Sequence, residues 1–360
     1  MHYDIPVDKL QQILDDYTAS GRECGVQLAI YQHGRLEANL CSGYTDNTRS
    51  CKITADHLFP IFSTGKGIMT IAFHMLKEEF GFSYTDKVSK YWHEFTGNGR
   101  EDAQILHILS HRTGLHMLQG LPDLSEKMAD WDFMSRKMTT DTPKWQPGTK
   151  CGYQSLTFAW LLGELAFRIS GIPFKKYIQD KIITPLGLEK SFYFGIDDEA
   201  DQRFVPIDIS AMEGKFSWPH GFTGNPVFRR AFIPSANGIA TAEAVARIYN
   251  AVYNPCGSTP ALLKKETIEE ATVLMRHPDD PIPQNEKIWT KFGLGFVLPV
   301  WETGRGDIFG HGGAAGAEGF YCKSRDLAVC FVKNMVLPAH PEHPVRDSIS
   351  HALGLPTRYW

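Results

Sequence analysis

Apolar residues near both ends of the 360-residue chain follow the patterns of strands and amphipathic helices. Residues 7–20 place their apolar side chains on one helical face, which predicts a helix. Two runs of strand composition follow at 26–31 and 36–44, and the polar turn between them predicts a β-hairpin. Strand composition returns near the C-terminus, where the predicted elements are three strands and a closing helix: 292–300, 319–323, 327–335 and 345–353.

The middle of the chain is mostly helical in pattern. A short helix is predicted from residue 103 and breaks at Thr113 and Gly114, and residues 120–144 are polar with one acidic helix. Residues 195–235 are rich in proline, glycine and aromatic residues without periodicity, which predicts long loops over a site. The remaining predicted helices have apolar residues three or four positions apart: 156–169, 174–183, 242–253 and 262–273.

Strands at the two ends of the chain, joined by hairpins within each end, predict one antiparallel sheet. The expected fold is α+β, with five or more antiparallel strands flanked by the terminal helices and a large, mostly helical insertion. Residues 1–80 and 285–360 together would form the sheet domain, and residues 81–284 the mostly helical domain. The cleft between them is the expected place for an active site.

The apolar segment 59–76 carries a serine and a lysine at its start. Ser63 lies at or just inside the predicted helix N-terminus, and Lys66 follows one turn later on the same face. A serine hydroxyl becomes a good nucleophile when a base removes its proton, and a lysine can be that base only when it is neutral. Because the helix has little charge before Lys77, it should be buried, and burial lowers the pKa of a lysine. The same pattern also fits a serine cap followed by a solvated lysine.

Two other places could meet Ser63 and Lys66 in the cleft. Tyr153 and Ser155 lie at the turn that opens the predicted helix 156–169, and residues 310–314, with the sequence Gly-His-Gly-Gly-Ala, lie beside a C-terminal strand. Taken alone, Tyr153 could be a half-buried aromatic residue and the glycine run a flexible turn with a surface histidine. The patterns S-x-x-K and Y-x-S each occur once in the chain. All three motifs in this order are far less likely to occur by chance than any one of them alone.

These positions resemble the serine β-lactamase-like superfamily, which includes penicillin-binding proteins, class C β-lactamases and family VIII carboxylesterases. The matching motifs are Ser63-x-x-Lys66, Tyr153-x-Ser155 and His311-Gly312-Gly313. The resemblance extends from about residue 25 to 335 and includes further similar stretches at 108–115, 145–148, 185–188 and 235–238.

The resemblance implies a role for each matching residue. Ser63 would be the acylated nucleophile, and either Lys66 would deprotonate it or Lys66 would hold Tyr153 as a phenolate that does so. Tyr153 would pass the proton to the leaving group. Backbone N–H groups of Ser63 and Ala314 would form the oxyanion hole. The other residues implied to line the substrate are Ser155, His311, Gly312 and Gly313.

The chain departs from the lactamase pattern at two of the motifs. His311-Gly312-Gly313 stands where lactamases carry Lys-Thr-Gly, so a fixed cation suited to a carboxylate is replaced by a histidine that is mostly neutral at pH 7. Tyr-x-Asn becomes Tyr-x-Ser, which removes an amide that could bind an acylamino group. Both changes favour neutral esters, as in family VIII carboxylesterases. The predicted function is therefore a serine hydrolase acting on small esters through an acyl-enzyme on Ser63. The alternatives are an acyltransferase to a metabolite, a weak β-lactamase or D-amino-acid peptidase, and, least favoured, a non-catalytic scaffold.

The resemblance implies a small-molecule ester or amide as the partner, and composition argues against two other classes of partner. The formal net charge is −4 and no basic run occurs, which argues against nucleic acid or an anionic membrane as partner. No stretch of ~18 apolar residues exists, and the acidic N-terminal segment lacks the pattern of a signal peptide, so a cytoplasmic location is expected. Seven cysteines without a C-x-x-C motif predict free thiols. No cofactor or metal is expected, since His340 and His343 lie in a proline-rich stretch typical of a surface loop.

Overall fold

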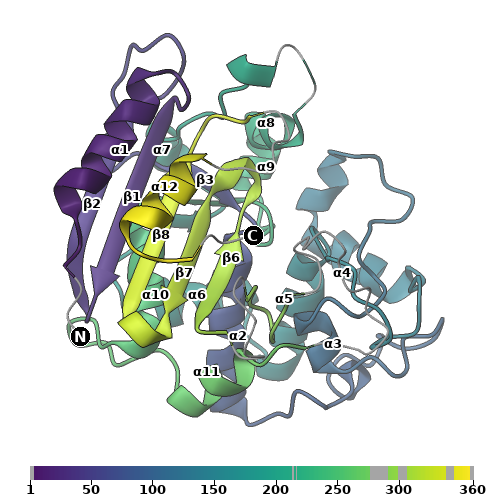
Figure 1. The fold of residues 1–360 in the computed structure, drawn as a ribbon. Helices are drawn as coiled ribbons and strands as arrows, with labels where there is room; N and C mark the ends of the chain where they lie inside the picture. The colour runs from purple at the N-terminus through teal and green to yellow at the C-terminus, as the bar shows by residue number, and fades with distance from the viewer. Residues whose placement is uncertain are drawn as a thin grey trace.

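A five-stranded antiparallel sheet forms one side of the molecule in the computed structural model (Figure 1). The structure describes residues 4–212, 215, 217–275, 291–298, 306–337 and 344–356. The strand order is β2-β1-β8-β7-β6, and β1 pairs with β8 from Val26 opposite Lys333 to Gln32 opposite Leu327. The predicted antiparallel sheet built from both ends of the chain is confirmed. Its strands are β1 (Gly25–Gln32), β2 (Arg35–Gly43), β6 (Ile308–Gly312), β7 (Glu318–Cys322) and β8 (Leu327–Lys333).

Helices cover both faces of this sheet. Helices α1 (Val7–Ala19) and α12 (Pro344–Ala352) pack together on one face, and α10 (Ala242–Tyr253) packs on β1, β7 and β8 from the other. Alternate residues of β1 point to opposite faces, so Leu28 packs with α1 and α12 whereas Ala29 belongs to the main core. This double coverage explains why every residue of β1 is buried. Helix α10 belongs to the segment assigned to the helical domain, yet it covers the sheet; the division into two domains stays a prediction.

The prediction of a strand at 292–300 is wrong for its described residues. Phe292 and Val297 form a single β-bridge across a tight loop, and Val297 forms another with Gly310. The loop turns at Gly295, whose φ of +89° lies in the left-handed region that favours glycine. The edge strand of the sheet is β6 instead, and His311 therefore lies within a strand rather than beside one. Residues 299 and 300 lie outside the described part of the chain.

The helical side of the molecule is built around α5, an apolar helix that packs on both α2 and α4. Helix α2, which begins just after Ser63, and α5, which begins just after Tyr153, thus lie side by side. The helices of this side are α2 (Gly65–Phe80), α3 (Ile105–Leu109), α4 (Trp131–Thr140), α5 (Phe158–Ser170), α6 (Phe174–Ile178) and α11 (Lys265–Ala271). Single turns are η1 (Val88–Lys90), η2 (Glu126–Ala129), η3 (Gln179–Ile183), η4 (Ser210–Met212), η5 (Ala314–Gly316) and η6 (Lys323–Arg325).

A second, three-stranded sheet holds the segment that leads into Ser63. Its order is β3-β5-β4, with both pairs antiparallel. The strands are β3 (Phe59–Phe62), β5 (Gly238–Ala240) and β4 (Phe192–Phe194). This sheet was absent from the sequence prediction because strands of three or four residues are too short to show an alternating pattern.

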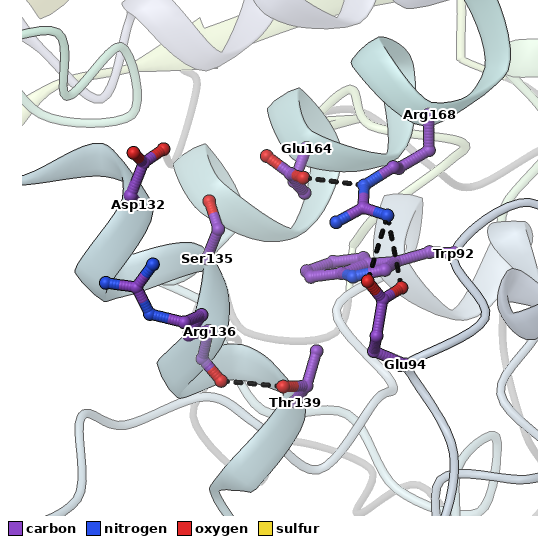
Figure 2. A pocket seen from close by; sticks show the side chains of 8 residues that line it. All are labelled: Trp92, Glu94, Asp132, Ser135, Arg136, Thr139, Glu164 and Arg168. Atoms are coloured by element: carbon purple, nitrogen blue, oxygen red, sulfur yellow. Dashed lines mark hydrogen bonds and ion pairs between the residues drawn. The ribbon is translucent and has the colours of Figure 1, made fainter.

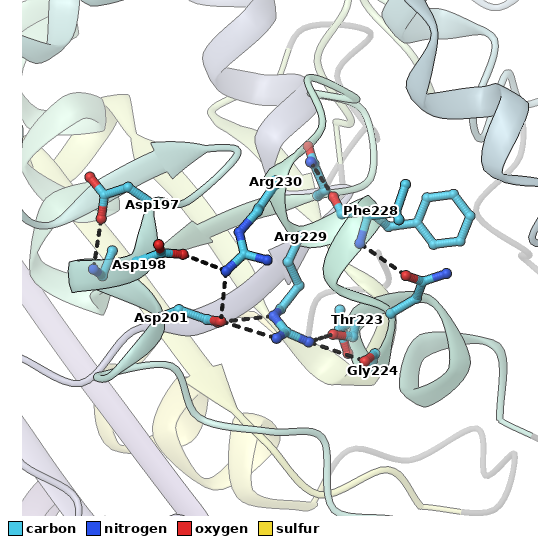
Figure 3. A network of polar contacts seen from close by, with 12 residues as sticks. Asp197, Asp198, Asp201, Thr223, Gly224, Phe228, Arg229 and Arg230 are labelled. Atoms are coloured by element: carbon cyan, nitrogen blue, oxygen red, sulfur yellow. Dashed lines mark hydrogen bonds and ion pairs between the residues drawn. The ribbon is translucent and has the colours of Figure 1, made fainter.

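The segment 195–235 contains short helices, so the prediction of long loops is wrong for much of it. The helices are α7 (Asp198–Asp201), α8 (Trp218–Gly224) and α9 (Pro226–Arg230). Arg229 binds both carboxylate oxygens of Asp201 at 3.0 and 3.2 Å and donates to the carbonyl oxygens of Thr223 and Gly224 (Figure 3). Arg230 pairs with Asp198 at 2.5 Å. Helices of fewer than two full turns show no periodicity in sequence, and these ion pairs fix them instead.

Candidate active site

Ser63 lies at a turn between β3 and α2. The helix begins at Gly65 with Thr64 as its N-cap, so Ser63 stands just outside the helix rather than at its first residue. The preceding residue, Phe62, has a φ of +46°, in the left-handed region that a bulky residue rarely adopts. Its side chain is buried, and this packing holds the strained turn. The turn leaves the hydroxyl of Ser63 partly exposed at the end of a rigid strand.

Lys66 is fully buried and its amine faces Ser63. The Nζ atom lies 3.0 Å from Ser63 Oγ, within hydrogen-bond distance, and donates to the carbonyl oxygens of Ser155 and Ser235 at 2.7 Å each. No carboxylate of the described chain pairs with it. Burial therefore holds the pKa of Lys66 well below its ordinary value. Burial thus favours the uncharged amine, which is the form that can accept a proton from a serine hydroxyl.

Tyr153 lies against the same amine. Lys66 Nζ is 4.9 Å from the centre of the Tyr153 ring. Burial raises the pKa of Tyr153 above its ordinary value, and a side-chain hydrogen bond with Ser63 only partly offsets this. The hydroxyl of Tyr153 is therefore a neutral phenol that can donate a hydrogen bond, and it is within reach of the Ser63 hydroxyl.

His311 comes from β6 of the five-stranded sheet and lies against Tyr153. Its ring stacks on Tyr153 with 6.0 Å between ring centres, and its Nδ1 donates to the carbonyl oxygen of Gly312 at 2.6 Å. With the proton on Nδ1, Nε2 is an acceptor; it is buried and has no hydrogen-bond partner among the described residues. Burial is the main cause that lowers the pKa of His311 to about 3. The histidine is therefore neutral at physiological pH.

Gly313 brings the end of β6 directly against the turn of Ser63. A Cβ atom added to Gly313 would lie 2.3 Å from the carbonyl oxygen of Ile61 and 3.0 Å from Oγ1 of Thr64, the residues on either side of the Phe62–Ser63 pair. The backbone N–H of Gly313 donates to the carbonyl oxygen of Ala317 at 2.7 Å, which closes the following turn. The structure brings the Ser63, Tyr153 and His311 motifs to one place.

Ser155 contributes differently from what its position in the motif suggests. Its side chain is exposed, whereas its backbone carbonyl accepts the hydrogen bond from Lys66. Ser235 supplies the matching carbonyl from the other side, and its hydroxyl donates to the carbonyl oxygen of Leu156 at 2.9 Å. Sequence reasoning noted Ser235 only as part of a similar stretch. Backbone acceptors leave no signature in the sequence, so this contact could not be assigned.

His111 packs against Tyr153. Sequence reasoning noted it, like Ser235, only as part of a similar stretch. Its ring packs edge-on against Tyr153 at 5.0 Å and against Phe292 at 4.3 Å. Its Nδ1 accepts a hydrogen bond from the backbone N–H of Gln154 at 3.2 Å. Burial is the main cause that holds the pKa of His111 well below its ordinary value. A neutral, buried histidine thus fixes the ring and the backbone of the Tyr153 turn.

A pocket between α4 and α5 lies apart from these residues (Figure 2). It encloses about 140 Å³ and includes none of the predicted site residues. Arg168 pairs with Glu164 at 2.8 Å and with Glu94 at 3.1 Å, and Glu164 also accepts from the Trp131 indole at 3.0 Å. Arg168 thus lies between two glutamates, so the pocket holds a structural ion-pair network.

The described residues offer no candidate metal centre, because no group of three or more His, Cys, Asp or Glu side chains comes together among them. The pair His340 and His343 lies outside the described ranges. No described helix is both long and apolar enough to cross a membrane. None of the seven cysteines, all of which lie in the described part of the chain, forms a disulfide; three are buried, and Cys51 is exposed.

Comparison with known proteins agrees with this geometry. The chain is 26% identical over 339 residues to a protein named esterase/beta-lactamase LipL from Mycobacterium tuberculosis, covering 87% of this chain and 77% of that protein. The crystal structure of a family VIII carboxylesterase superposes with a TM-score of 0.85 at 24% identity, over 98% of both chains. A penicillin-binding protein homologue from Caulobacter crescentus superposes with a TM-score of 0.81 at 25% identity, over 97% of this chain and 95% of that one.

The fold of the five-stranded sheet with its helical insertion is thus that of the β-lactamase and transpeptidase proteins. The family model described as Beta-lactamase matches residues 10–353, a span that includes Ser63, Lys66, Tyr153 and His311. Family, fold and relatives all indicate a serine hydrolase. The chain belongs to the beta-lactamase family.

Proposed function

We propose that this protein is a carboxylesterase that hydrolyses small, neutral esters through an acyl-enzyme on Ser63. The observation that carries the proposal is the fully buried amine of Lys66, whose pKa is held well below its ordinary value and which lies 3.0 Å from Ser63 Oγ. A serine with an adjacent neutral base is an activated nucleophile. A solvated lysine beside a helix cap would have no such effect.

Lys66 is the base that this arrangement favours. Its two N–H bonds point to the carbonyl oxygens of Ser155 and Ser235, which leaves the lone pair of a neutral amine directed at the Ser63 hydroxyl. The proton moves from Oγ to Nζ as the Oγ–carbon bond forms. When the ester bond breaks, the departing alkoxide takes that proton. Water then adds to the acyl-enzyme, gives up a proton to Nζ and releases the acid as Ser63 regains its hydroxyl proton.

Tyr153 acts as a phenol in this scheme. Because burial raises its pKa, the phenolate is the disfavoured form, and the role of acylation base falls to Lys66. A neutral phenol hydrogen-bonded to Ser63 can relay the proton between Lys66 and the leaving oxygen. It donates to the alkoxide and recovers its proton from Nζ, so no net charge develops on the ring.

The backbone N–H groups of Ser63 and Ala314 form the proposed oxyanion hole. The close approach of Gly313, the residue before Ala314, to Ile61 and Thr64, which flank the Phe62–Ser63 pair, supports this assignment. Each such donor contributes about 3 kcal/mol of transition-state stabilisation in comparable hydrolases.

The neutral state of His311 favours esters over carboxylate-bearing amides. Its buried Nε2 is an acceptor, and an acceptor repels the carboxylate that a lysine at this place would attract. The exposed hydroxyl of Ser155 replaces an amide that could hold an acylamino group. A β-lactam would therefore lose two recognition contacts, whereas a small neutral ester needs neither.

The test combines labelling with turnover. Intact-protein mass after treatment with a fluorophosphonate should increase by one adduct in the wild type and not in Ser63→Ala, and p-nitrophenyl esters should be turned over with little turnover of nitrocefin. Preferred turnover of nitrocefin or of a D-amino-acid amide would establish the amidase alternative. Labelling with little hydrolysis that rises on addition of an alcohol or amine would establish acyl transfer. The absence of any adduct would refute the catalytic proposal and leave a non-catalytic scaffold.

A further inference from the structure

A pocket of about 320 Å³ opens beside the turn of Tyr153 and Ser155. Its walls are mainly apolar, and the side chains that matter here are Leu118, Leu121, Leu124, Met128, Leu156 and Trp218. Asp123 is the one lining residue of the described chain with a formal charge. Binding sites for small molecules occupy roughly 300–1,000 Å³, so this pocket is of the size that takes one substituent.

Two contacts join this pocket to the nucleophile. Ser155 lines the pocket, and its carbonyl oxygen accepts the hydrogen bond of Lys66 at 2.7 Å. Trp218 also lines the pocket, and its ring centre is 6.5 Å from that of Phe62, the residue before Ser63. The pocket therefore lies beside the reacting centre.

The walls of the pocket are held in place by the rest of the fold. Trp218 stacks on Phe222 at 4.6 Å, and Phe222 stacks on Phe228 at 4.7 Å. Arg229 ties the end of α8 to Asp201 of α7, as Figure 3 shows. Leu118, Leu121 and Leu124 are partly buried against the main core on the facing wall. A pocket built in this way is formed before a ligand binds, so less conformational entropy is lost on binding.

We propose that this pocket binds an uncharged hydrocarbon substituent of the ester substrate, and that it selects esters with medium-length chains over acetates. This inference rests on the proposed esterase function. An apolar group gains free energy by leaving water for such a lining, and each fully buried methylene raises kcat/KM by up to about fourfold. The carboxylate of Asp123 disfavours an anionic substituent at the same place. The substituent belongs either to the acyl chain or to the alcohol.

The test uses one lining residue and a matched control. Leu124 has a φ of +58°, which asparagine adopts more readily than leucine, so Leu124→Asn makes the wall polar without straining the backbone. The control Leu36→Asn makes the same change on β2, where Leu36 is 44% exposed and lines no part of the site. Both variants and the wild type are assayed with p-nitrophenyl esters from acetate to octanoate, and with acetates of alcohols from methanol to octanol.

The wild type should prefer hexanoate over acetate, or hexyl acetate over methyl acetate, by at least about tenfold in kcat/KM. Leu124→Asn should lower that ratio at least threefold, and Leu36→Asn should not change it. The series in which the preference appears identifies the group that occupies the pocket. Turnover that depends on Ser63 but shows no length preference in either series would overturn the pocket assignment alone. Absence of Ser63-dependent turnover would overturn the esterase proposal and this assignment together.

Discussion

Replacing Gly313 with alanine tests whether the contact between β6 and the Ser63 turn serves catalysis. Gly313 lies in extended backbone, with a φ of −121°, so alanine brings no conformational strain of its own. The added methyl group would stand 2.3 Å from the carbonyl oxygen of Ile61. That neighbour is backbone, which cannot rotate away as the end of a side chain can. The strand and the turn must therefore move apart.

The size of the movement follows from the distance. Real Cβ contacts essentially never fall below 3.0 Å, so the separation must grow from 2.3 to 3.0 Å, a shift of 0.7 Å. A displacement of roughly 1 Å at a catalytic centre costs about 100-fold in rate, so kcat should fall about 10- to 100-fold. Overpacking of this kind also costs about 1–3 kcal/mol of stability. The protein should therefore remain folded while its catalysis drops.

The assay measures kcat and KM with p-nitrophenyl butyrate, the rate of fluorophosphonate labelling, and Tm. Gly224→Ala is the matched control, because a Cβ there meets nothing within 4 Å and the backbone is not left-handed. We expect Gly313→Ala to lose turnover and labelling rate together, with Gly224→Ala like the wild type. Wild-type kcat and labelling in a folded Gly313→Ala protein would refute the assignment of Ala314 to the oxyanion hole.

Three further predictions concern the reacting groups. Ser63→Ala should lower kcat about 10⁶-fold while the circular dichroism spectrum stays unchanged, and near-wild-type turnover would show that another residue is the nucleophile. Lys66→Met should abolish turnover yet raise Tm at neutral pH, because it removes a buried amine. The folded-state pKa of Lys66 is depressed, so between that value and about 10.4 the unfolded state holds more protons and the wild type gains stability as pH rises. The Tm difference between variant and wild type should therefore shrink towards high pH, and an unchanged difference would contradict a neutral Lys66. His311→Gln should keep the wild-type acid limb of kcat/KM between pH 5 and 9, because the pKa of His311 is about 3; loss of that limb would show that His311 titrates in catalysis.

The sequence predicts most of the parts that use long, regular patterns. The hairpin of β1 and β2, the C-terminal strands β7 and β8 and the helices α1, α5 and α10 are confirmed within a few residues. The burial of Lys66 also follows from sequence, because the helix after Ser63 carries almost no charge for three turns. The side chains of Ser63, Lys66, Tyr153 and His311 could be identified from sequence because their three motifs occur along the chain in the order found in the resembling family.

What the sequence does not reveal depends on short elements and on backbone atoms. The strands β3, β4 and β5 have three or four residues, and α7 to α9 have four to seven, so no periodicity develops. The two carbonyl groups that hold Lys66 belong to Ser155 and Ser235, and any residue type could supply them. The close approach of Gly313 to the carbonyl oxygen of Ile61, more than 200 positions away in the chain, likewise leaves no signature in the sequence.

The pairing of β1 with β8 has a consequence for how the chain folds as it is made. Val26 lies opposite Lys333, so 307 residues (333 − 26) must be synthesised after one partner before the other exists. At synthesis rates of about 5–20 residues per second, roughly 15–60 s pass between the synthesis of β1 and that of β8. During that time a strand whose every residue is buried in the finished protein has one unpaired edge and no C-terminal helix to cover it. The nascent chain therefore passes through a long, aggregation-prone interval, and binding by chaperones at the N-terminal hairpin is the expected protection.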